Sequence, residues 1–413
     1  MDTFDTVIVG AGHAAVSLYA QLRKSGYAGR IGVFEKQDHL PYERPPLSKG
    51  YMTGDVSETE LLLRQPQYWD DAAVELRTST EVVSLDAASQ TVTTAAGETI
   101  GYGTLVWATG ASARELPLDG ADSANVVSVR TLDDARRLST LARGTAHSVI
   151  IGGGYIGLET ASTLVKLGHR VTVLEAQERL LARVAGPTIA ARLQRVHEEH
   201  GVRVLLGVGV ERIETDGDRA VAVHLADGER LPADVIVVGV GVIPEIALLA
   251  EAGAEIGNGV IVDAEGRTTL PHVYAVGDIA AQQNAFAGGA VARLESVPNA
   301  ADQAKVVAAS IVGAAPVERA VPWFWSHQYE LRLQTAGILT GFDREVVREG
   351  ADGAITVGYF KDDALLAADC LGAPADFNAV KNALKQRVAV TAERFGSAEP
   401  LTVALRMTSP ASA

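Results

Sequence analysis

The apolar positions of the chain group into short runs, each followed by a helical pattern. Residues 7–9 (Val-Ile-Val) and 149–151 (Val-Ile-Ile) are continuous apolar triplets, which is typical of buried parallel strands. After the first triplet, Ala15, Leu18 and Leu22 recur at the spacing of one helical face. The pattern therefore predicts a strand, a tight turn and a helix at the start of the chain.

The second triplet is followed by the same kind of helix. Gly157, Ala161 and Leu164 share one face of it, and small residues at such positions let a helix lie close to a sheet. Gly26 and Gly168 stand where the two helices should end, since glycine favours the left-handed conformation that closes a helix.

Each helix leads into another strand that ends on an acidic residue. The strands are expected at 31–34 and 170–174, and the acids are Glu35 and Glu175. The whole unit thus occurs twice, at an offset of 142 residues, which is far longer than the period of a solenoid. The sequence predicts a duplicated βαβ domain.

The turns between strand and helix carry the chemistry. They read Gly10-x-Gly12-x-x-Ala15 and Gly152-x-Gly154-x-x-Gly157. The first glycine makes the turn, the second admits a pyrophosphate to the backbone, and the third position must be small. The helix N-terminus then offers N–H groups to phosphate, and an acid some 20 residues on accepts hydrogen bonds from a ribose. We predict two dinucleotide sites.

Three later apolar runs extend the same architecture. Residues 105–110 and 235–244 occupy corresponding places in the two halves, and residues 273–278 form a strand that ends in Gly-Asp. An aspartate at the carboxyl edge of a strand can accept a hydrogen bond from a sugar-like hydroxyl, as on a flavin ribityl chain. Asp278 is a candidate for this role, and a purely structural Gly-Asp turn, which is common, is the alternative.

Composition narrows the class of protein. The length of 413 residues predicts two to four domains, and the hydrophobic fraction of 47% supports large buried cores. The net charge of −15 argues against nucleic-acid binding. The N-terminus shows no signal-peptide pattern and no apolar run is long enough to cross a membrane, so we expect a cytoplasmic protein. One cysteine, Cys370, excludes a redox cysteine pair, and we expect it to be buried. No metal site is predicted.

Four segments make the sequence similar to a known family. It resembles the FAD-dependent NADH:ferredoxin reductases of bacterial oxygenase systems (the putidaredoxin reductase, rubredoxin reductase and aromatic-ring dioxygenase reductase type), within the glutathione-reductase superfamily. The resemblance covers nearly the whole chain and is most specific at 41–49 (PYERPPLSK), 152–159 (GGGYIGLE), 295–300 (ESVPNA) and 322–329 (PWFWSHQY).

The resemblance implies an α/β fold with two Rossmann-like dinucleotide-binding domains and a C-terminal α+β domain. It implies a discontinuous FAD-binding domain at 1–113 and 247–322, an NAD-binding domain at 114–246 and a C-terminal domain at 323–413. Alternating residues from 329 to 335, further β-like runs at 345–349, 354–360 and 364–370, and a helix at 377–390 fit this last domain.

The resemblance also implies the site residues. FAD would be held by Gly10, Gly12, Ala14, Glu35, Arg44, Lys49, Val82, Arg130, Asp278, Val297 and Trp325. NAD would be held by Gly152, Gly154, Tyr155, Ile156, Glu159, Glu175 and Arg183. Lys49 and Glu159 are the candidate catalytic residues, as an ion pair beside the flavin; a purely structural salt bridge is the alternative.

Two of these residues carry a physical argument of their own. Val297 precedes Pro298, where a helix can begin, so its N–H and the helix dipole would stabilise negative charge on a reduced flavin. Glu175 would repel a 2′-phosphate, which favours NADH over NADPH, although Arg179 and Arg183 follow closely and could soften that preference.

The implied activity is hydride transfer from NADH to FAD, followed by single-electron transfer to a two-iron ferredoxin, of Rieske or vertebrate type, that serves an oxygenase. This chain is acidic and ferredoxins usually are too, so docking should need a local basic patch. We expect that patch at Lys305 and the Trp323–Trp325 edge, with Arg332 as a weaker candidate. Alternatives are a rubredoxin reductase, an NADH oxidase, which would need an active-site cysteine, and an apoptosis-inducing-factor-like flavoprotein.

Overall fold

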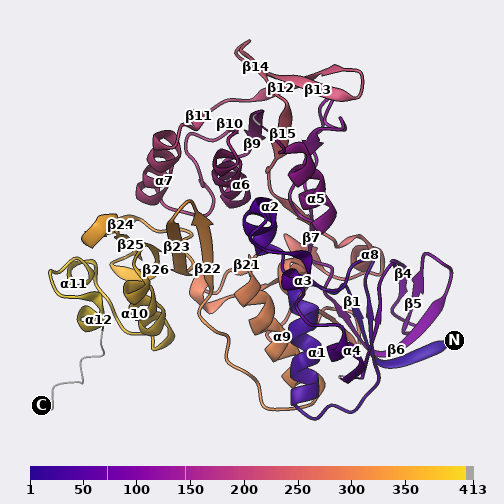
Figure 1. Ribbon diagram of the computed structural model, residues 1–413. Coiled ribbons are helices and arrows are strands. Elements are labelled where there is room, and N and C mark those ends of the chain that lie inside the picture. The colour runs from indigo at the N-terminus through magenta and orange to yellow at the C-terminus, as the bar shows by residue number, and fades with distance from the viewer. Residues whose placement is uncertain (72, 145, 406–413) are drawn as a thin grey trace, which may run out of the picture. The chain divides into compact units, whose positions relative to one another are not determined.

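The chain folds into two compact units, each built from separate stretches of sequence. The computed structural model describes residues 1–71, 73–144 and 146–405 (Figure 1). The first unit holds residues 1–43, 59–112 and 243–323, and the second holds residues 44–58, 113–242 and 324 onward. The second unit therefore contains both the expected NAD-binding segment and the C-terminal segment. The division into three domains stays a prediction.

A mixed sheet forms the framework of the first unit. Its order is β3-β2-β1-β6-β5-β4, and β19 also pairs with β6. The pairs β3–β2, β2–β1, β1–β6 and β6–β19 are parallel, whereas β5 and β4 continue the sheet antiparallel. The strands are β1 (Asp2–Val9), β2 (Ile31–Phe34), β3 (Val74–Arg77), β4 (Val82–Asp86), β5 (Thr91–Thr94), β6 (Thr99–Trp107) and β19 (Val273–Ala275).

Two long helices cover one face of this sheet. Figure 1 shows α1 (His13–Lys24) and α9 (Val297–Ile311) side by side, and their residues are in contact. The apolar face predicted for α1 is fully buried in the core that they share with β1 and β2. The smaller elements of this unit are α4 (Gln67–Asp71), α8 (Ala247–Glu251), the 3-10 turns η2 (Gly277–Ile279) and η3 (Ala285–Ala287), and a sheet of β17 (Ile256–Gly257), β18 (Gly259–Val262), β20 (Ala280–Gln283) and β21 (Val291–Arg293).

The second unit repeats the parallel arrangement. Its sheet has the order β11-β10-β9-β15-β8, and each of its pairs is parallel. The strands are β8 (Val126–Val127), β9 (His147–Ile151), β10 (Arg170–Glu175), β11 (Arg203–Leu206) and β15 (Val235–Val238), and the helices are α5 (Leu132–Leu141), α6 (Tyr155–Lys166) and α7 (Pro187–Glu199). The duplication predicted from the sequence is thus confirmed by two parallel βαβ units.

Short elements join and flank these layers. An antiparallel sheet of β12 (Val210–Asp216), β13 (Arg219–Leu225) and β14 (Arg230–Pro232) belongs to the second unit, as do the 3-10 turn η1 (Pro45–Ser48) and α2 (Gly50–Thr53). The elements at the sequence boundaries of the units are α3 (Glu58–Leu61), β7 (Ala111–Ala113) and β16 (Val242–Pro244).

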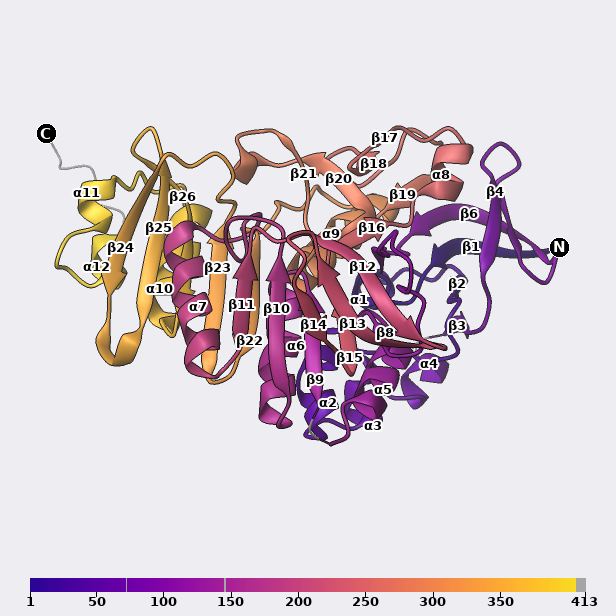
Figure 2. The ribbon, with the colours of Figure 1, turned by 90° about the horizontal axis from the view of Figure 1, so that it is seen from above.

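A five-stranded antiparallel sheet closes the described chain. Its order is β22-β23-β26-β25-β24, and α10 lies along β23 and β26 on one face, as Figure 2 shows. The elements are β22 (Trp323–Gln328), β23 (Leu331–Gly337), β24 (Arg344–Glu349), η4 (Ala351–Gly353), β25 (Ile355–Lys361), β26 (Ala364–Leu371), α10 (Pro374–Lys385), α11 (Ala392–Phe395) and α12 (Leu401–Ala404). The predicted α/β class with two Rossmann-like units and a further C-terminal part is confirmed.

The structure corrects the prediction at the start of this sheet. Tyr329 was expected inside a strand that runs to Thr335, but it has φ of 53° and lies between β22 and β23. The alternating pattern is real from Leu331 onward, and the aromatic run before Tyr329 forms an additional strand. The helix expected at 377–390 is α10, which begins earlier, at Pro374, and ends earlier, at Lys385.

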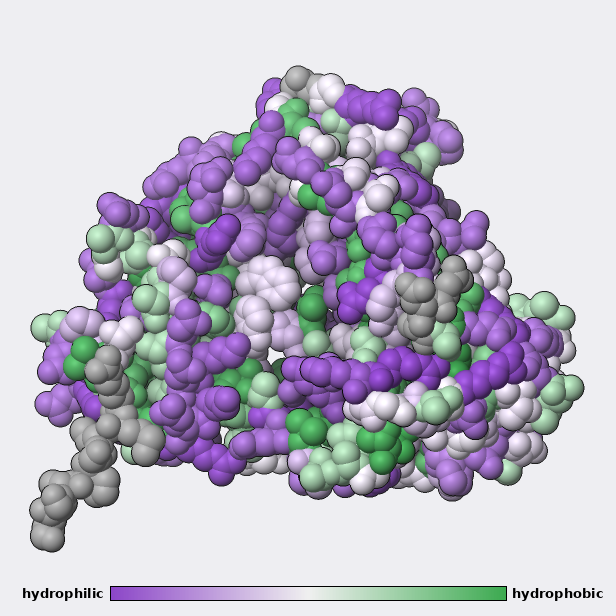
Figure 3. Space-filling view, turned by 60° about the horizontal axis from the view of Figure 1, so that its bottom comes forward, coloured by the Kyte–Doolittle hydropathy of each residue, from purple (hydrophilic) through white to green (hydrophobic). Residues whose placement is uncertain are grey.

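The surface and the helix lengths agree with the composition. No helix among the described residues is long and apolar enough to cross a membrane. Hydrophilic residues predominate on the face shown in Figure 3, and hydrophobic residues appear there as separate small areas. Cys370 is buried as expected, and this burial raises the pKa of its thiol.

One carboxylate lies in the core of the C-terminal sheet. Asp369 of β26 has no exposed surface and accepts hydrogen bonds from the hydroxyl groups of Thr335 and Tyr359, each at 2.5 Å. Its charge also acts on Tyr155 of α6 and on the neighbouring Cys370, and it interacts with Glu345 of β24. Burial outweighs the two donors and raises the pKa of Asp369 from 3.8 to about 6.

We predict that this buried acid makes the second unit less stable as the pH rises. A folded-state pKa above the unfolded value means that the native state retains the proton longer, so the contribution is complete below about pH 4 and lost by about pH 6. The loss amounts to at most about 3 kcal/mol. Between pH 4 and 7, the wild type should lose this stability whereas Asp369→Asn should not. The free energy of unfolding of Asp369→Asn should therefore rise relative to that of the wild type.

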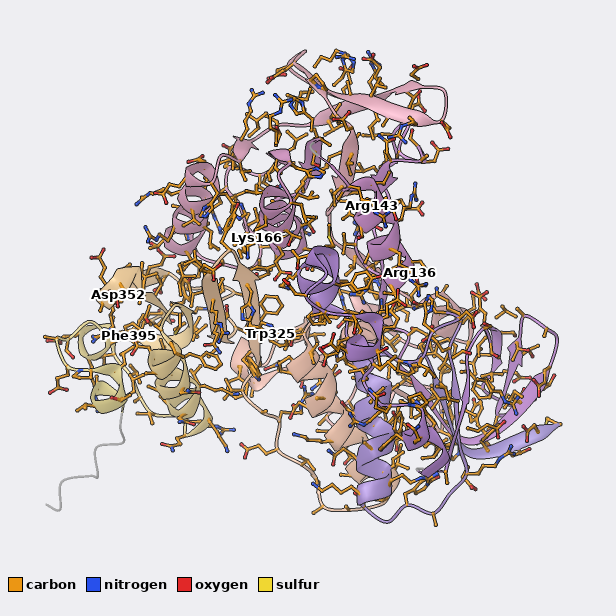
Figure 4. The ribbon with its side chains drawn as sticks, viewed as in Figure 1. Arg136, Arg143, Lys166, Trp325, Asp352 and Phe395 are labelled. Atoms are coloured by element: carbon orange, nitrogen blue, oxygen red, sulfur yellow. The ribbon has the colours of Figure 1, made fainter. Side chains whose placement is uncertain are left out.

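Asp352→Asn is the matched control, because Asp352 is exposed in η4 of the same sheet, where Figure 4 labels it. Urea denaturation across this pH range checks the prediction. The lost hydrogen bond can shift the free energy of unfolding of Asp369→Asn by a constant amount. If its plot against pH is parallel to that of the wild type, the prediction is contradicted.

Candidate functional site

The first glycine turn has the geometry that a dinucleotide site requires. Gly10 has φ of 94°, and a Cβ atom there would stand 2.6 Å from the carbonyl oxygen of Ala108. Gly12 is the N-cap of α1, and a Cβ atom there would meet nothing within 4 Å. No side chain among the described residues caps this helix, so its N-terminal N–H groups have no side-chain acceptor, as a phosphate-binding helix start requires.

Glu35 closes the turn from the end of β2. Its Oε2 accepts a hydrogen bond from the N–H of Ala11 at 2.8 Å, and its Oε1 accepts one from the N–H of Gln37 at 3.0 Å. Each carboxylate oxygen has lone pairs for more than one donor, so the group can still accept from a ribose hydroxyl. The acid is therefore held at the glycine turn, as the spacing predicts.

The Gly-Asp segment and both long helices of the first unit meet beside this turn. A Cβ atom on Gly277, whose φ is 80°, would lie 3.1 Å from that of Ala14 in α1 and 4.0 Å from that of Ala300 in α9. The N–H of Gly277 donates to Gln303 of α9 at 2.7 Å. The structure thus brings Ala14, the turn that carries Asp278 and the start of α9 together.

Helix α9 begins as the sequence predicts. Val297 is its first residue, Pro298 the second, and the Ser296 hydroxyl caps it by accepting from the N–H of Asn299 at 3.2 Å. Lys305 lies exposed on the same helix. Val82, by contrast, is buried in the core around β6, so that its side chain is used in packing.

The second glycine turn is more tightly closed than the first. Gly152 has φ of 112°, and a Cβ atom there would stand 2.3 Å from the Gly239 carbonyl oxygen. A Cβ atom on Gly157 would come within 2.1 Å of the Gly152 oxygen, so only glycine fits. Gly154 is the uncapped N-cap of α6 and, like Gly12, opens onto space.

Glu175 has the same role in this turn as Glu35 in the first. Its Oε2 accepts from the N–H of Gly153 and its Oε1 from the N–H of Gln177, both at 2.8 Å. The two nearby arginines differ: Arg179 donates to the carbonyl groups of Ala185 and Ala182 at 2.8 and 2.9 Å, and so holds its own loop. Arg183 is exposed and remains the candidate for contact with the nucleotide.

Apolar and aromatic groups surround the start of α6. Ile156 is 45% exposed, although it follows directly on the glycine turn. The Tyr155 ring packs against that of Phe324, with centroids 4.6 Å apart, and its hydroxyl lies 3.5 Å from the Val184 carbonyl oxygen. Val184 is itself 41% exposed. Exposed apolar surface therefore lies at the start of α6, and Val184 is a part of it that the sequence analysis did not single out.

The predicted ion pair of Lys49 and Glu159 is present and buried. The Lys49 Nζ lies 2.5 Å from Glu159 Oε2, and the Glu159 side chain is only 3% exposed. The Ser48 hydroxyl donates to the same oxygen at 2.9 Å, and the Ser326 hydroxyl donates to Oε1 at 2.7 Å. The nearby His327 has a lowered pKa, because it is partly buried and close to the positive charges of Arg332 and Lys49.

Ser48 and Ser326 are site residues that the sequence analysis did not single out. Both stand inside the segments that carry the family resemblance, but nothing in the local pattern shows that their hydroxyl groups converge on Glu159. They are 111 and 167 residues away from it along the chain.

Arg44 and Arg130 lie together in the second unit. The Arg44 guanidinium donates to the Arg130 carbonyl oxygen at 2.6 Å, and the N–H of Arg130 donates to Asp134 in the first turn of α5 at 3.1 Å. The Thr131 capping box fixes this turn. The hydrogen bond brings the Arg44 guanidinium to the backbone of Arg130, the other predicted pyrophosphate-binding arginine.

The residues of β22 alternate between two roles. Phe324 and Ser326 share the strand face that contacts Tyr155 and Glu159. Trp325 points to the other face and is half-buried (Figure 4).

The expected FAD-binding residues come from both units. The first unit holds Gly10, Gly12, Ala14, Glu35, Val82, Asp278 and Val297, and the second holds Arg44, Lys49, Arg130 and Trp325.

Comparison with known proteins agrees with this geometry. Residues 4–304 match the model of the pyridine nucleotide-disulphide oxidoreductase family, and residues 323–405 match the reductase C-terminal family. The chain belongs to the pyridine nucleotide-disulphide oxidoreductase family. It is a flavoenzyme that uses FAD and NAD(P)H.

Individual relatives match over almost their whole length. The chain is 44% identical to a ferredoxin–NAD(P)+ reductase of Sphingomonas sp., with 91% of each chain covered. It is 44% identical to the 5,5′-dehydrodivanillate O-demethylase ferredoxin reductase subunit of a Sphingobium species, with 91% and 92% covered. Putidaredoxin reductase, solved in its covalent complex with putidaredoxin, superposes with a TM-score of 0.94 at 36% identity, with 98% of each chain covered.

The residues of this family member fit both cofactors. The open space at Gly12 would take the FAD pyrophosphate, and the equivalent space at Gly154 would take that of the nicotinamide cofactor. The family name includes disulphide chemistry, but this chain has a single cysteine, and it lies buried in the C-terminal sheet. A redox cysteine pair within the chain is therefore excluded.

We predict that Gly10→Ala weakens FAD binding. The added Cβ would clash with the Ala108 carbonyl oxygen, so the turn must move away from the phosphate position. Backbone strain at such a site costs about 1–3 kcal/mol, which corresponds to roughly ten- to hundredfold weaker binding. The FAD-to-protein absorbance ratio after dialysis measures the loss.

Gly26→Ala provides the control, because Gly26 has φ of 79° but nothing within 4 Å of its Cβ position. It carries the same kind of strain without the clash. If Gly10→Ala retains as much FAD as Gly26→Ala, the turn does not hold the cofactor.

Proposed function

We propose that the protein oxidises NADH and delivers electrons one at a time to a two-iron ferredoxin that serves a bacterial oxygenase. The observation that carries this proposal is the pair of glycine turns, each with its acid, in a chain that has no redox cysteine pair. Relatives that carry the name ferredoxin reductase, aligned over nine-tenths of the chain, support the choice of acceptor.

The residues of the chain bind and orient, whereas FAD supplies the exchange between two-electron and one-electron transfer when it is bound. The ion pair of Lys49 with the buried Glu159 is the arrangement we assign to charge control beside the flavin. Ser48 and Ser326 hold the Glu159 carboxylate as an acceptor. Tyr155 and Ile156, at the start of α6, would hold the nicotinamide end of the cofactor when it is bound.

Two other functions are less well supported. An NADH oxidase or peroxidase would require a reactive cysteine, but Cys370 is buried and has a raised pKa. An apoptosis-inducing-factor-like protein would be expected to have a basic nucleic-acid surface, and the net charge of −15 does not favour one. A rubredoxin in place of the ferredoxin is the alternative that the experiment below must distinguish from the proposed acceptor.

The cytoplasmic location stays a prediction.

We propose docking of the ferredoxin at Lys305 and the Trp323–Trp325 edge. Both partners are acidic, so an encounter needs a local cation, and Lys305 is exposed on α9, which starts at Val297. Arg332 on β23 is also exposed and is the second candidate. The half-buried Trp325 offers an aromatic edge next to the buried Ser326–Glu159 contact.

The decisive experiment follows the flavin after stopped-flow mixing with NADH. We expect fast bleaching, and reduction of cytochrome c only when a two-iron ferredoxin is present. Trp325→Ala should slow ferredoxin reduction more than it slows flavin reduction, and Lys305→Glu should raise the KM for ferredoxin roughly tenfold at low salt, fading as salt screens the charges.

Lys24→Glu is the matched control for this test, because Lys24 is also exposed on a long helix of the first unit and the charge change is the same. Cytochrome c reduction without ferredoxin, or with rubredoxin alone, would overturn the proposed acceptor. Unchanged ferredoxin kinetics in Lys305→Glu at low salt would remove that residue from the docking surface.

We further propose that Glu175 makes NADH the preferred donor. Its carboxylate stands at the turn that would hold the adenosine ribose, where it would accept from a free hydroxyl and repel a 2′-phosphate. Arg179 is committed to its own loop and does not counter this charge. Glu175→Arg should lower kcat/KM for NADH and raise it for NADPH, each by roughly ten- to hundredfold.

Steady-state kinetics with both cofactors measures this switch. Glu178→Arg is the control, because Glu178 is an exposed acid three residues further on. Equal use of the two cofactors by the wild type would show that Glu175 does not select between them.

A further inference from the structure

A chain of buried hydrogen bonds runs from Glu159 to helix α7. Ser326 Oγ lies 2.7 Å from Glu159 Oε1, Gln328 Nε2 lies 3.1 Å from Ser326 Oγ, and His197 Nε2 lies 2.9 Å from Gln328 Oε1. The Tyr329 hydroxyl ends the chain, 3.1 Å from His197 Nδ1. The four inner residues are each no more than 2% exposed, so water does not compete for these bonds.

The direction of every bond in the chain follows from the charge of Glu159. An ionised carboxylate only accepts, so Ser326 must donate its single proton to Glu159 and accept from Gln328. Gln328 therefore presents its NH₂ group to Ser326 and its oxygen to His197. His197 must then carry its proton on Nε2, which leaves Nδ1 to accept from the Tyr329 hydroxyl.

The surroundings keep both ends of the chain in these states. At one end, the Lys49 Nζ lies 2.5 Å from Glu159 Oε2 and supplies the opposite charge. Burial lowers the pKa of His197, which favours the neutral imidazole. Burial raises the pKa of Tyr329, which keeps its hydroxyl proton available.

We propose that Ser326, Gln328 and His197 are positioning residues that hold Glu159 as a charged acceptor, and that the charge of Glu159 in turn sets the tautomer of His197. The proposal rests on the role proposed above for the Lys49–Glu159 pair. His197 fixes the orientation of the Gln328 amide. Without it the amide can rotate, Ser326 then donates to Gln328, and Glu159 loses one of its three donors.

Neutralising Glu159 should reverse the whole chain. In Glu159→Gln, the donors Lys49 and Ser48 keep the amide oxygen on their side, so the NH₂ group faces Ser326. Ser326 then donates to the oxygen of a rotated Gln328, whose NH₂ group donates to His197 Nε2. His197 moves its proton to Nδ1, which donates to Tyr329.

Nitrogen-15 NMR of the FAD-loaded, ¹⁵N-histidine-labelled protein tests this directly. The His197 signals are assigned by their loss in His197→Phe. We expect the Nε2–H tautomer in the wild type and the Nδ1–H tautomer in Glu159→Gln. His200 is an internal control, because its Nδ1 donates to the Val196 carbonyl oxygen at 2.8 Å and should be Nδ1–H in both proteins. In Glu159→Gln/Gln328→Met the link is cut, and His197 should no longer respond to residue 159.

A kinetic measurement tests the positioning role. Gln328→Met should slow flavin reduction by NADH by about tenfold, the usual worth of one hydrogen bond to a charged group, without raising the KM for NADH. The His200 ring stacks on that of Tyr329, with centroids 3.8 Å apart, but its hydrogen bond goes to the Val196 carbonyl oxygen. His200→Phe keeps an aromatic ring there and should leave that rate unchanged.

The outcomes separate this inference from the proposed function. An Nδ1–H tautomer for His197 in the wild type, or no change in Glu159→Gln, overturns the hydrogen-bond chain even if ferredoxin is reduced normally. A tautomer switch with an unaffected rate in Gln328→Met overturns the positioning role. Failure of ferredoxin reduction in the wild type overturns the proposed acceptor but leaves the tautomer result in force.

Discussion

The buried carboxylate of Glu159 is the constraint on which the arrangement of the second unit depends. A charge at 3% exposure is tolerated only if every lone pair that faces the interior has a donor. The donors come from the turn before α2 and from β22, so the three segments have to meet at one point. Removing one partner of such a buried pair typically costs about 3–5 kcal/mol. The same interaction that would serve the flavin therefore also fixes β22 against α6.

The two glycine turns share the same hydrogen bond to an acidic residue but differ in the size of the side chain that fits at their third position. In both, the acid at the end of the second strand accepts from the middle residue of the turn. The third position differs: Ala15 fits in the first unit, whereas a methyl group on Gly157 would strike the Gly152 oxygen. The second helix thus lies closer to its turn, which follows from a different packing of α6 and not from a different ligand chemistry.

The sequence predicts those features that depend on short stretches of chain. The strand at 31–34, the glycine turns and the start of α9 at Val297 all follow from neighbouring residues, and the structure has them where expected. The hairpin at Tyr329 was not predicted, because its positive φ interrupts an alternating pattern that continues on both sides. Sequence periodicity cannot distinguish one long strand from two joined by a tight turn.

Contacts between distant segments lie beyond such reasoning. The hydroxyl groups of Ser48 and Ser326 could each be a surface group, a cap or a ligand, and only the fold makes them partners of Glu159. The same is true of His197, which appears on α7 as an ordinary histidine near the end of a helix. Once the positions are known, elementary rules determine the direction of each hydrogen bond. An ionised carboxylate accepts, a hydroxyl donates one proton, and an amide accepts through its oxygen and donates through its NH₂ group. The polarity of a buried network is then set by its one charged member, and that charge extends its effect from α6 through β22 to α7.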